Sequence, residues 1–128
     1  MNKRIMIVDD EQSILLSLAH ALRAEGVEVF AFDQIEDAEK ALETGPPFDL
    51  VIADIRMSGI DGIQGLELLS YIKERYNTQV IIMTGFGSKE VETDAYRRGA
   101  LHYFNKPIDI TQLQQAVASI GIPTKNYA

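Results

Sequence analysis

Four of the five apolar runs in this sequence are followed by polar residues whose types suit chemistry on phosphoryl groups. Carboxylates gathered at one place repel one another unless a cation joins them, and carboxylate oxygens are ligands suited to Mg²⁺ or Mn²⁺. An ammonium and a hydroxyl can bind phosphoryl oxygens, and an aspartate beside a metal can attack phosphorus. The residues in question are Asp9, Asp10 and Glu11, then Asp54, Thr84 and Lys106.

The pattern of apolar residues predicts the elements that would position these side chains. Short runs rich in β-branched or aromatic residues predict strands at 4–8, 27–32, 50–53, 80–83 and 100–104. Amphipathic stretches predict helices over 13–25, 35–44, 65–75 and 88–98, and a last helix that begins near Asp109 or Thr111. Gly26 is expected to cap the first helix at its C-terminus, and Asp109 or Thr111 to cap the last one at its N-terminus.

Strands that alternate with helices predict an α/β fold, a doubly wound parallel sheet of five strands with helices on both faces. In such folds ligands lie beyond the carboxyl ends of the strands, which is where the polar residues are found. The thin apolar stripe of the fourth helix, with only Val91, Ala95 and Tyr96, indicates weak attachment to the core.

Length and composition favour one globular domain in the cytoplasm. The chain has 128 residues, 46% of them hydrophobic, and no cysteine, which excludes disulfides and thiolate sites. A formal charge of −7 opposes general binding to nucleic acids, and the apolar run after the charged N-terminus is too short to span a membrane.

Four motifs in order, "IMIVDDE", "DLVIADIRMSGIDG", "IIMTG" and "YFNKP", resemble the receiver domain of bacterial response regulators, the CheY-like superfamily of two-component systems. The resemblance covers essentially the whole chain. It implies the strand order 2-1-3-4-5, a receiver domain over 1–121, and a tail or the start of a linker over 122–128. The run "FNKPID" followed by "TQLQQAV" is similar to receivers that precede effector domains.

The resemblance also implies a role for each matching residue. Asp54 would be the phosphoacceptor and a metal ligand, Asp10 a direct metal ligand, and Asp9 would reach the metal through water. Thr84 and Lys106 would contact the phosphoryl group, and Thr84 and Tyr103 would act as the switch. Further expected features are the backbone carbonyl of Arg56 as a metal ligand, a cis peptide at Lys106-Pro107, and control of dephosphorylation timing by Arg56 and Phe86.

Two departures from the family pattern fall in the loop after Asp54. Ser58 stands where the family usually has proline, and residues 63–65 look like an insertion. We therefore expect a different loop shape and an unchanged site.

The function that follows from the resemblance is a phosphorylation-controlled signalling domain, which promotes only its own phosphorylation and dephosphorylation. The expected phosphodonor is a sensor histidine kinase or a phosphotransfer protein. The output would pass through the surface of the fourth helix, fifth strand and fifth helix, to a downstream effector or a second copy of the chain, with no direct binding of nucleic acid or membrane.

Three other functions are less consistent with the sequence. A haloacid dehalogenase-type phosphatase needs a second acid two residues after the nucleophile, where this chain has Arg56. A flavodoxin-like module would not hold the FMN phosphate against "DDEQS", and a histidine phosphotransfer module is a helical bundle. "TGFGS" lacks the lysine of a phosphate-binding P-loop. His20 and His102 read as structural residues because no second histidine stands at ligand spacing.

Overall fold

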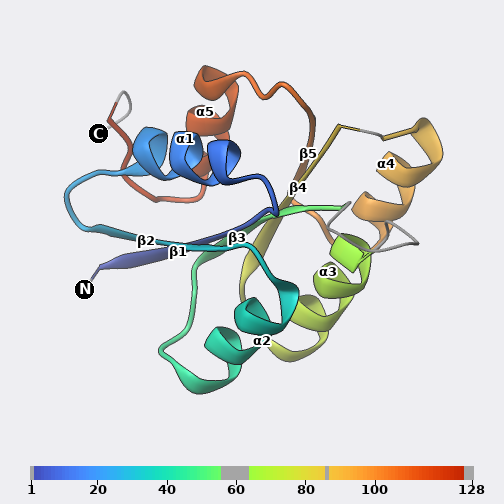
Figure 1. Cartoon of the computed structure of the whole chain (residues 1–128), viewed down its shortest axis with the longest axis horizontal. Helices are drawn as coiled ribbons and strands as arrows, with labels where there is room; N and C mark the ends of the chain where they lie inside the picture. Colours follow the sequence, from blue (N-terminus) through green and yellow to red (C-terminus); the bar gives the residue numbers. More distant parts are fainter. Residues whose placement is uncertain (1, 56–63, 86, 126–128) are drawn as a thin grey trace.

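A five-stranded parallel sheet with helices on both faces forms the core of the protein (Figure 1). The computed structural model describes residues 2–55, 64–85 and 87–125. The elements in chain order are β1 (Lys3–Val8), α1 (Gln12–Leu22), β2 (Val27–Phe32), α2 (Ile35–Thr44), β3 (Leu50–Asp54), α3 (Gln64–Arg75), β4 (Gln79–Thr84), α4 (Lys89–Arg97), β5 (His102–Asn105) and α5 (Ile110–Ser119).

The strand order is β2-β1-β3-β4-β5, as the resemblance implied. All four strand pairs are parallel, so every strand has its carboxyl end at the same edge of the sheet. Each strand of the inner three is an almost unbroken apolar run because both of its faces are covered. The predicted doubly wound α/β fold is confirmed.

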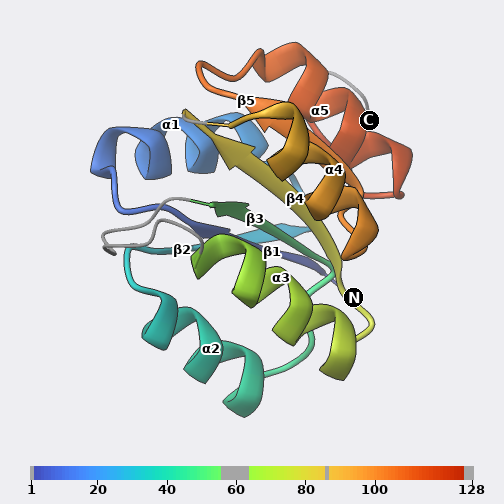
Figure 2. The same cartoon turned by 90° about the vertical axis from the view of Figure 1, so that its right-hand side faces the viewer.

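Two hydrophobic clusters lie on opposite faces of the sheet. Alternate strand residues such as Ile7, Ile52 and Met83 pack against α1 and α5, and their neighbours, such as Val8, Ala53 and Ile82, pack against α2, α3 and α4. Figure 2 shows α1 and α5 on one side of the sheet, and α2 and α3 on the other. Helix α4 buries only Ala95, which agrees with its thin apolar stripe.

The predicted end of the first helix is wrong. The backbone of Arg23 is already extended, with φ −67° and ψ 125°, so α1 stops at Leu22, three residues short of the prediction. Gly26, at φ +80°, serves the turn into β2 instead of the helix cap. At the last helix, Asp109 is the N-cap, and its side chain accepts a hydrogen bond of 3.2 Å from the Gln112 amide.

The packed chain continues past residue 121. Ile122 belongs to the cluster under α1 and α5, and Thr124 is also buried. The boundary after residue 121 stays a prediction, but residues 122–124 pack against the domain. None of the helices described here is long and apolar enough to cross a membrane.

Candidate functional site

Three parallel strands and one loop deliver the charged residues to the carboxyl edge of the sheet. Asp9 follows β1 directly and Asp54 is the last residue of β3. Lys106 comes one residue after β5, and its amide donates to the Thr84 carbonyl at the end of β4. The register of the sheet therefore fixes where each of these side chains begins.

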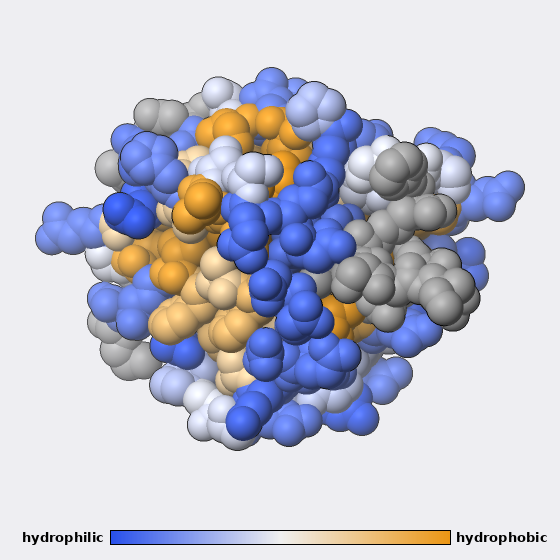
Figure 3. Space-filling view, viewed as in Figure 1, coloured by the Kyte–Doolittle hydropathy of each residue, from blue (hydrophilic) through white to orange (hydrophobic). Residues whose placement is uncertain are grey.

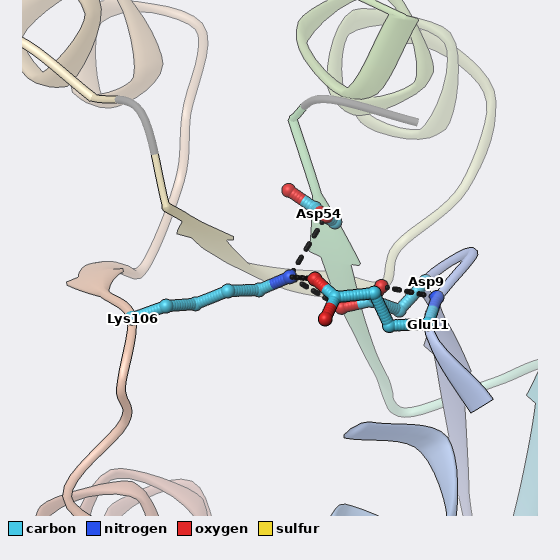
Figure 4. A network of polar contacts seen from close by, with 4 residues as sticks. All are labelled: Asp9, Glu11, Asp54 and Lys106. Atoms are coloured by element: carbon cyan, nitrogen blue, oxygen red, sulfur yellow. Dashed lines mark hydrogen bonds and ion pairs between the residues drawn. The ribbon is translucent and has the colours of Figure 1, made fainter. Parts of the chain in front are cut away.

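The Lys106 ammonium lies at the centre of this cluster (Figure 4). Its Nζ is 2.8 Å from Asp9 Oδ2, 2.9 Å from Asp54 Oδ2 and 3.1 Å from Glu11 Oε1. Asp9 is 0% exposed and Asp54 is 3% exposed, so these ion pairs form largely out of water. One ammonium thus pairs with two buried carboxylates and a third on the rim.

Burial and ion pairing have opposite effects on the pKa values of Asp9 and Lys106. Burial raises the pKa of the Asp9 carboxyl above its ordinary value, although Lys106 and the Glu11 amide both stabilise the charged form. Burial alone would lower the pKa of Lys106, but hydrogen bonds to Asp9, Asp54 and Glu11 outweigh it, and that pKa is raised. Lys106 therefore remains a cation at neutral pH.

The carboxylates offer oxygens close enough to hold one cation. Oxygens of Asp9, Glu11 and Asp54 all lie within 4.8 Å of one another, and hard divalent ions prefer such ligands. The ammonium already occupies a position where positive charge is favourable. The described residues therefore fit a divalent cation.

Asp9 and Asp10 differ sharply, although they are neighbours in the sequence. Asp9 is fully buried, with Oδ1 accepting the Glu11 amide at 2.9 Å and Oδ2 beside Lys106. Asp10 is exposed and is not part of the three-carboxylate group. Their distinct metal roles stay a prediction.

The residues expected to form the switch lie beside the cluster. Thr84 is fully buried, and Tyr103 is 9% exposed with its ring in the core. A Cβ on Gly87 would overlap both the Tyr103 hydroxyl and the Thr84 methyl group. Because Gly87 has no side chain, the Tyr103 hydroxyl can occupy the space beside it. The motif "TGFGS" did not indicate this packing role for Gly87.

The sequence placed Glu11 among the candidate acids, but the resemblance gave it no role, and the structure makes it part of the charged cluster. Glu11 pairs with Lys106, a contact between residues 95 positions apart that no local pattern signals. The Lys106-Pro107 peptide bond is cis, as the resemblance implied. Arg56, Phe86 and Ser58 lie outside the described residues, and Ser58 belongs to the loop whose sequence differs from the family pattern.

Comparison with known proteins gives a consistent result. The chain matches the family model "Response regulator receiver domain" over residues 5–118. It is 37% identical over 119 residues to the sporulation initiation phosphotransferase F of Bacillus subtilis (strain 168), a match that covers 91% of this chain and 92% of that protein. It is 41% identical over 109 residues to the DNA-binding transcriptional regulator NtrC of Proteus hauseri, a match that covers 84% of this chain and 22% of that protein.

Solved structures give the same result. The response regulator receiver domain protein (CheY-like) from Methanospirillum hungatei JF-1 has a TM-score of 0.81 at 31% identity, with 93% of each chain covered. A signal receiver domain from Colwellia psychrerythraea 34H has a TM-score of 0.84 at 26% identity, with 93% of this chain and 98% of that chain covered. These matches support neither the phosphatase nor the flavodoxin-like alternative.

Proposed function

Because this chain belongs to the response regulator receiver domain family of two-component signalling, we propose that Asp54 accepts a phosphoryl group from a phosphohistidine on a sensor kinase or phosphotransfer protein. The observation that carries this proposal is the pairing of Asp54 with Lys106 at 2.9 Å, in a site where Asp54 is almost fully buried. A nucleophile and a fixed cation are thereby held together at the edge of the sheet.

The transfer begins when a carboxylate oxygen of Asp54 attacks phosphorus in line. The bond from phosphorus to the imidazole nitrogen breaks, and its electron pair stays on the imidazole. Lys106 neutralises a phosphoryl oxygen once the Asp54 oxygen has become part of the new bond, and the Thr84 hydroxyl donates to another oxygen. Both residues come from strands whose ends meet at this edge, so they need little reorganisation.

A divalent cation would complete the site. We propose Asp10 and Asp54 as its direct ligands with the carbonyl of Arg56, and Asp9 as a ligand through water. Asp9 suits the indirect role because both its oxygens are engaged, by the Glu11 amide and by Lys106. When bound, Mg²⁺ or Mn²⁺ would neutralise charge on the phosphoryl oxygens during transfer.

The surface beside the site supports docking of the phosphodonor on α1. Leu16, a large apolar side chain of α1, is 71% exposed. It borders a groove with Leu15 and Ala19 of α1, and with Ala31 and Phe32 of β2. Figure 3 shows apolar side chains gathered over this side of the molecule. The groove includes Gln12, the residue after Glu11 of the charged cluster, and we propose that a partner seated there presents its phosphohistidine to Asp54.

After transfer, we propose that Thr84 and Tyr103 change the surface formed by α4, β5 and α5, which a downstream effector or a second copy recognises. The domain acts as a signalling element and promotes only its own phosphorylation and dephosphorylation. The match covers most of the phosphotransferase relative but only 22% of the NtrC relative, so the output of any longer protein is a separate question.

Intact-mass spectrometry after incubation with acetyl phosphate and Mg²⁺ tests the proposal. The wild type should gain one phosphoryl group and Asp54→Asn none. Asp109→Asn is the matched control, because asparagine also caps a helix and this site lies outside the cluster, so it should label like the wild type. Equal labelling of Asp54→Asn and the wild type would overturn the assignment.

A further inference from the structure

Helix α4 has few apolar contacts with the rest of the domain. Its only fully buried residue is Ala95, and Val91 adds a partly buried side chain. A helix with so few buried apolar contacts has low local stability compared with the core of the same protein. Single hydrogen bonds from α4 to its neighbours therefore weigh heavily in fixing its position.

One of these bonds joins α4 to the open edge of the sheet. β5 is the last strand in the order, so none of the described strands pairs with its outer side. There the backbone amide of Tyr103 donates a hydrogen bond of 3.2 Å to the hydroxyl of Tyr96, a residue of α4 that is 45% exposed. An exposed aromatic side chain thus satisfies an edge amide that another strand would otherwise take.

A second polar contact holds the C-terminal end of the helix. Arg98, which caps α4, reaches α3 through Nη1, which donates to the Leu66 carbonyl at 3.2 Å and to Ser70 Oγ at 3.1 Å. This contact is two residues from Tyr96 but faces a different element. The two contacts together fix α4 against both β5 and α3.

Tyr103 connects this arrangement to the charged site. Its ring fills the space beside Gly87 and Thr84, while its amide points outward to Tyr96. A movement of the Tyr103 ring therefore affects the residue whose backbone amide is bonded to Tyr96 of α4.

We propose that Tyr96 is a positioning residue whose hydroxyl latches α4 to the outer edge of β5 through the Tyr103 amide. Loss of this bond releases that side of the helix, while Arg98 retains the end near α3. The latch follows from contacts in the unphosphorylated protein, and only its consequence for signalling rests on the proposed function.

Amide hydrogen exchange measured by NMR tests the latch directly. In Tyr96→Phe the ring remains but the acceptor is lost, and protection of the Tyr103 amide should fall roughly fivefold, the factor expected for one net hydrogen bond. Tyr71→Phe is the matched control, because it removes a hydroxyl of α3 that is bonded to Glu43 of α2 instead of to β5. Protection of the Ile82 amide in the buried strand β4 reports that each variant is folded.

Unchanged protection of Tyr103 in Tyr96→Phe would overturn the latch. So would an equal loss in Tyr71→Phe, because the effect would then not be specific to the edge of β5. This measurement requires no phosphorylation, so it stands even if Asp54→Asn were to label like the wild type.

The coupling to signalling has its own measurement. If release of α4 favours the phosphorylated conformation, Tyr96→Phe should label with acetyl phosphate faster than the wild type, by up to the same roughly fivefold factor. An unchanged labelling rate, together with lost Tyr103 protection, would overturn the coupling and leave the latch as a structural contact.

Discussion

The Lys106 ammonium lies 2.9 Å from the Asp54 carboxylate, although β4 separates the two strands from which they come. The lysine side chain crosses over the end of β4 to reach it, and also contacts Asp9 beyond β1. The ammonium of this residue, which follows β5, therefore joins the ends of β1, β3 and β5, and its removal should affect both stability and metal dependence.

Lys106→Met should lower the free energy of unfolding in metal-free buffer by about 3 kcal/mol, because it leaves the buried carboxylates of Asp9 and Asp54 without their cation. Mg²⁺ should then stabilise this variant more than the wild type. Urea denaturation with and without Mg²⁺ measures both effects. Lys40→Met, an exposed lysine of α2, is the control, and a loss as large in this control would contradict the role of the cluster.

The buried carboxyl of Asp9 should make stability depend on pH. Because burial raises its pKa in the folded protein above the ordinary 3.8, the folded state holds this proton more tightly than the unfolded chain. The contribution of Asp9 to stability therefore falls as pH rises from about 4 through the raised pKa.

Asp9→Asn removes this effect, so in metal-free buffer it should be more stable than the wild type at pH 7, with a smaller difference near pH 4. Denaturant titrations at both values measure the difference. A difference that does not change with pH would show that the charge of Asp9 carries no net cost in the folded state.

Metal titrations distinguish the two neighbouring aspartates. Asp10→Ala should weaken Mg²⁺ binding more than Asp9→Ala, because a directly bound carboxylate acts at contact distance and a water-separated one is better screened. Calorimetric titration of both variants gives the comparison. The opposite order would exchange the two roles and make the group of Asp9, Glu11 and Asp54 the direct ligand set.

Gly87→Ala should drive the Tyr103 ring outward, because the added Cβ has no room beside the hydroxyl. Overpacking of this kind costs about 1–3 kcal/mol when it cannot relax. Nitration by tetranitromethane, followed by peptide mapping, should then modify Tyr103 faster than in the wild type. Gly85→Ala is the matched control, since its Cβ would meet only Lys106 Cδ at 3.9 Å. Equal nitration in all three proteins would contradict the packing role of Gly87.

The lifetime of the phosphorylated form provides a last prediction. By resemblance, Arg56 and Phe86 border the approach of water, and the Phe86 side chain has no atom that orients a water molecule. Phe86→Glu should therefore speed loss of phosphate roughly tenfold, or about 1.4 kcal/mol in the barrier. Decay is followed after removal of the donor, and equal rates in two folded proteins would exclude Phe86 from this role.

The sequence predicted the sheet, and it placed the candidate site residues at the strand ends, because both depend on local patterns. Apolar runs marked the strands, and Asp9, Asp54, Thr84 and Lys106 follow or end them in the structure. Strand ends of a parallel sheet meet at one edge, so position along the chain translated into position in space.

The contacts that the sequence did not predict depend on how elements pack. Asp9 and Asp10 are the same residue type, so the sequence does not distinguish them. The path of the chain after β1 buries Asp9 and exposes Asp10. The bond from the Tyr103 amide to Tyr96 likewise requires the placement of α4 beside β5. The end of α1 was missed because Gly26 looks like a cap, whereas the chain had already turned at Arg23.

The separation of Lys106 from its partners has a consequence for the growing polypeptide. Lys106 is 95 residues from Glu11 and 52 from Asp54, so these acids lack the lysine ammonium until nearly the whole domain has been synthesised. Long-range contacts of this kind form late, after the intervening strands have paired. A nascent chain on the ribosome that has not yet reached the end of β5 therefore has the carboxylates without the Lys106 ammonium. The site can bind a phosphoryl group only after the last strand has joined the sheet.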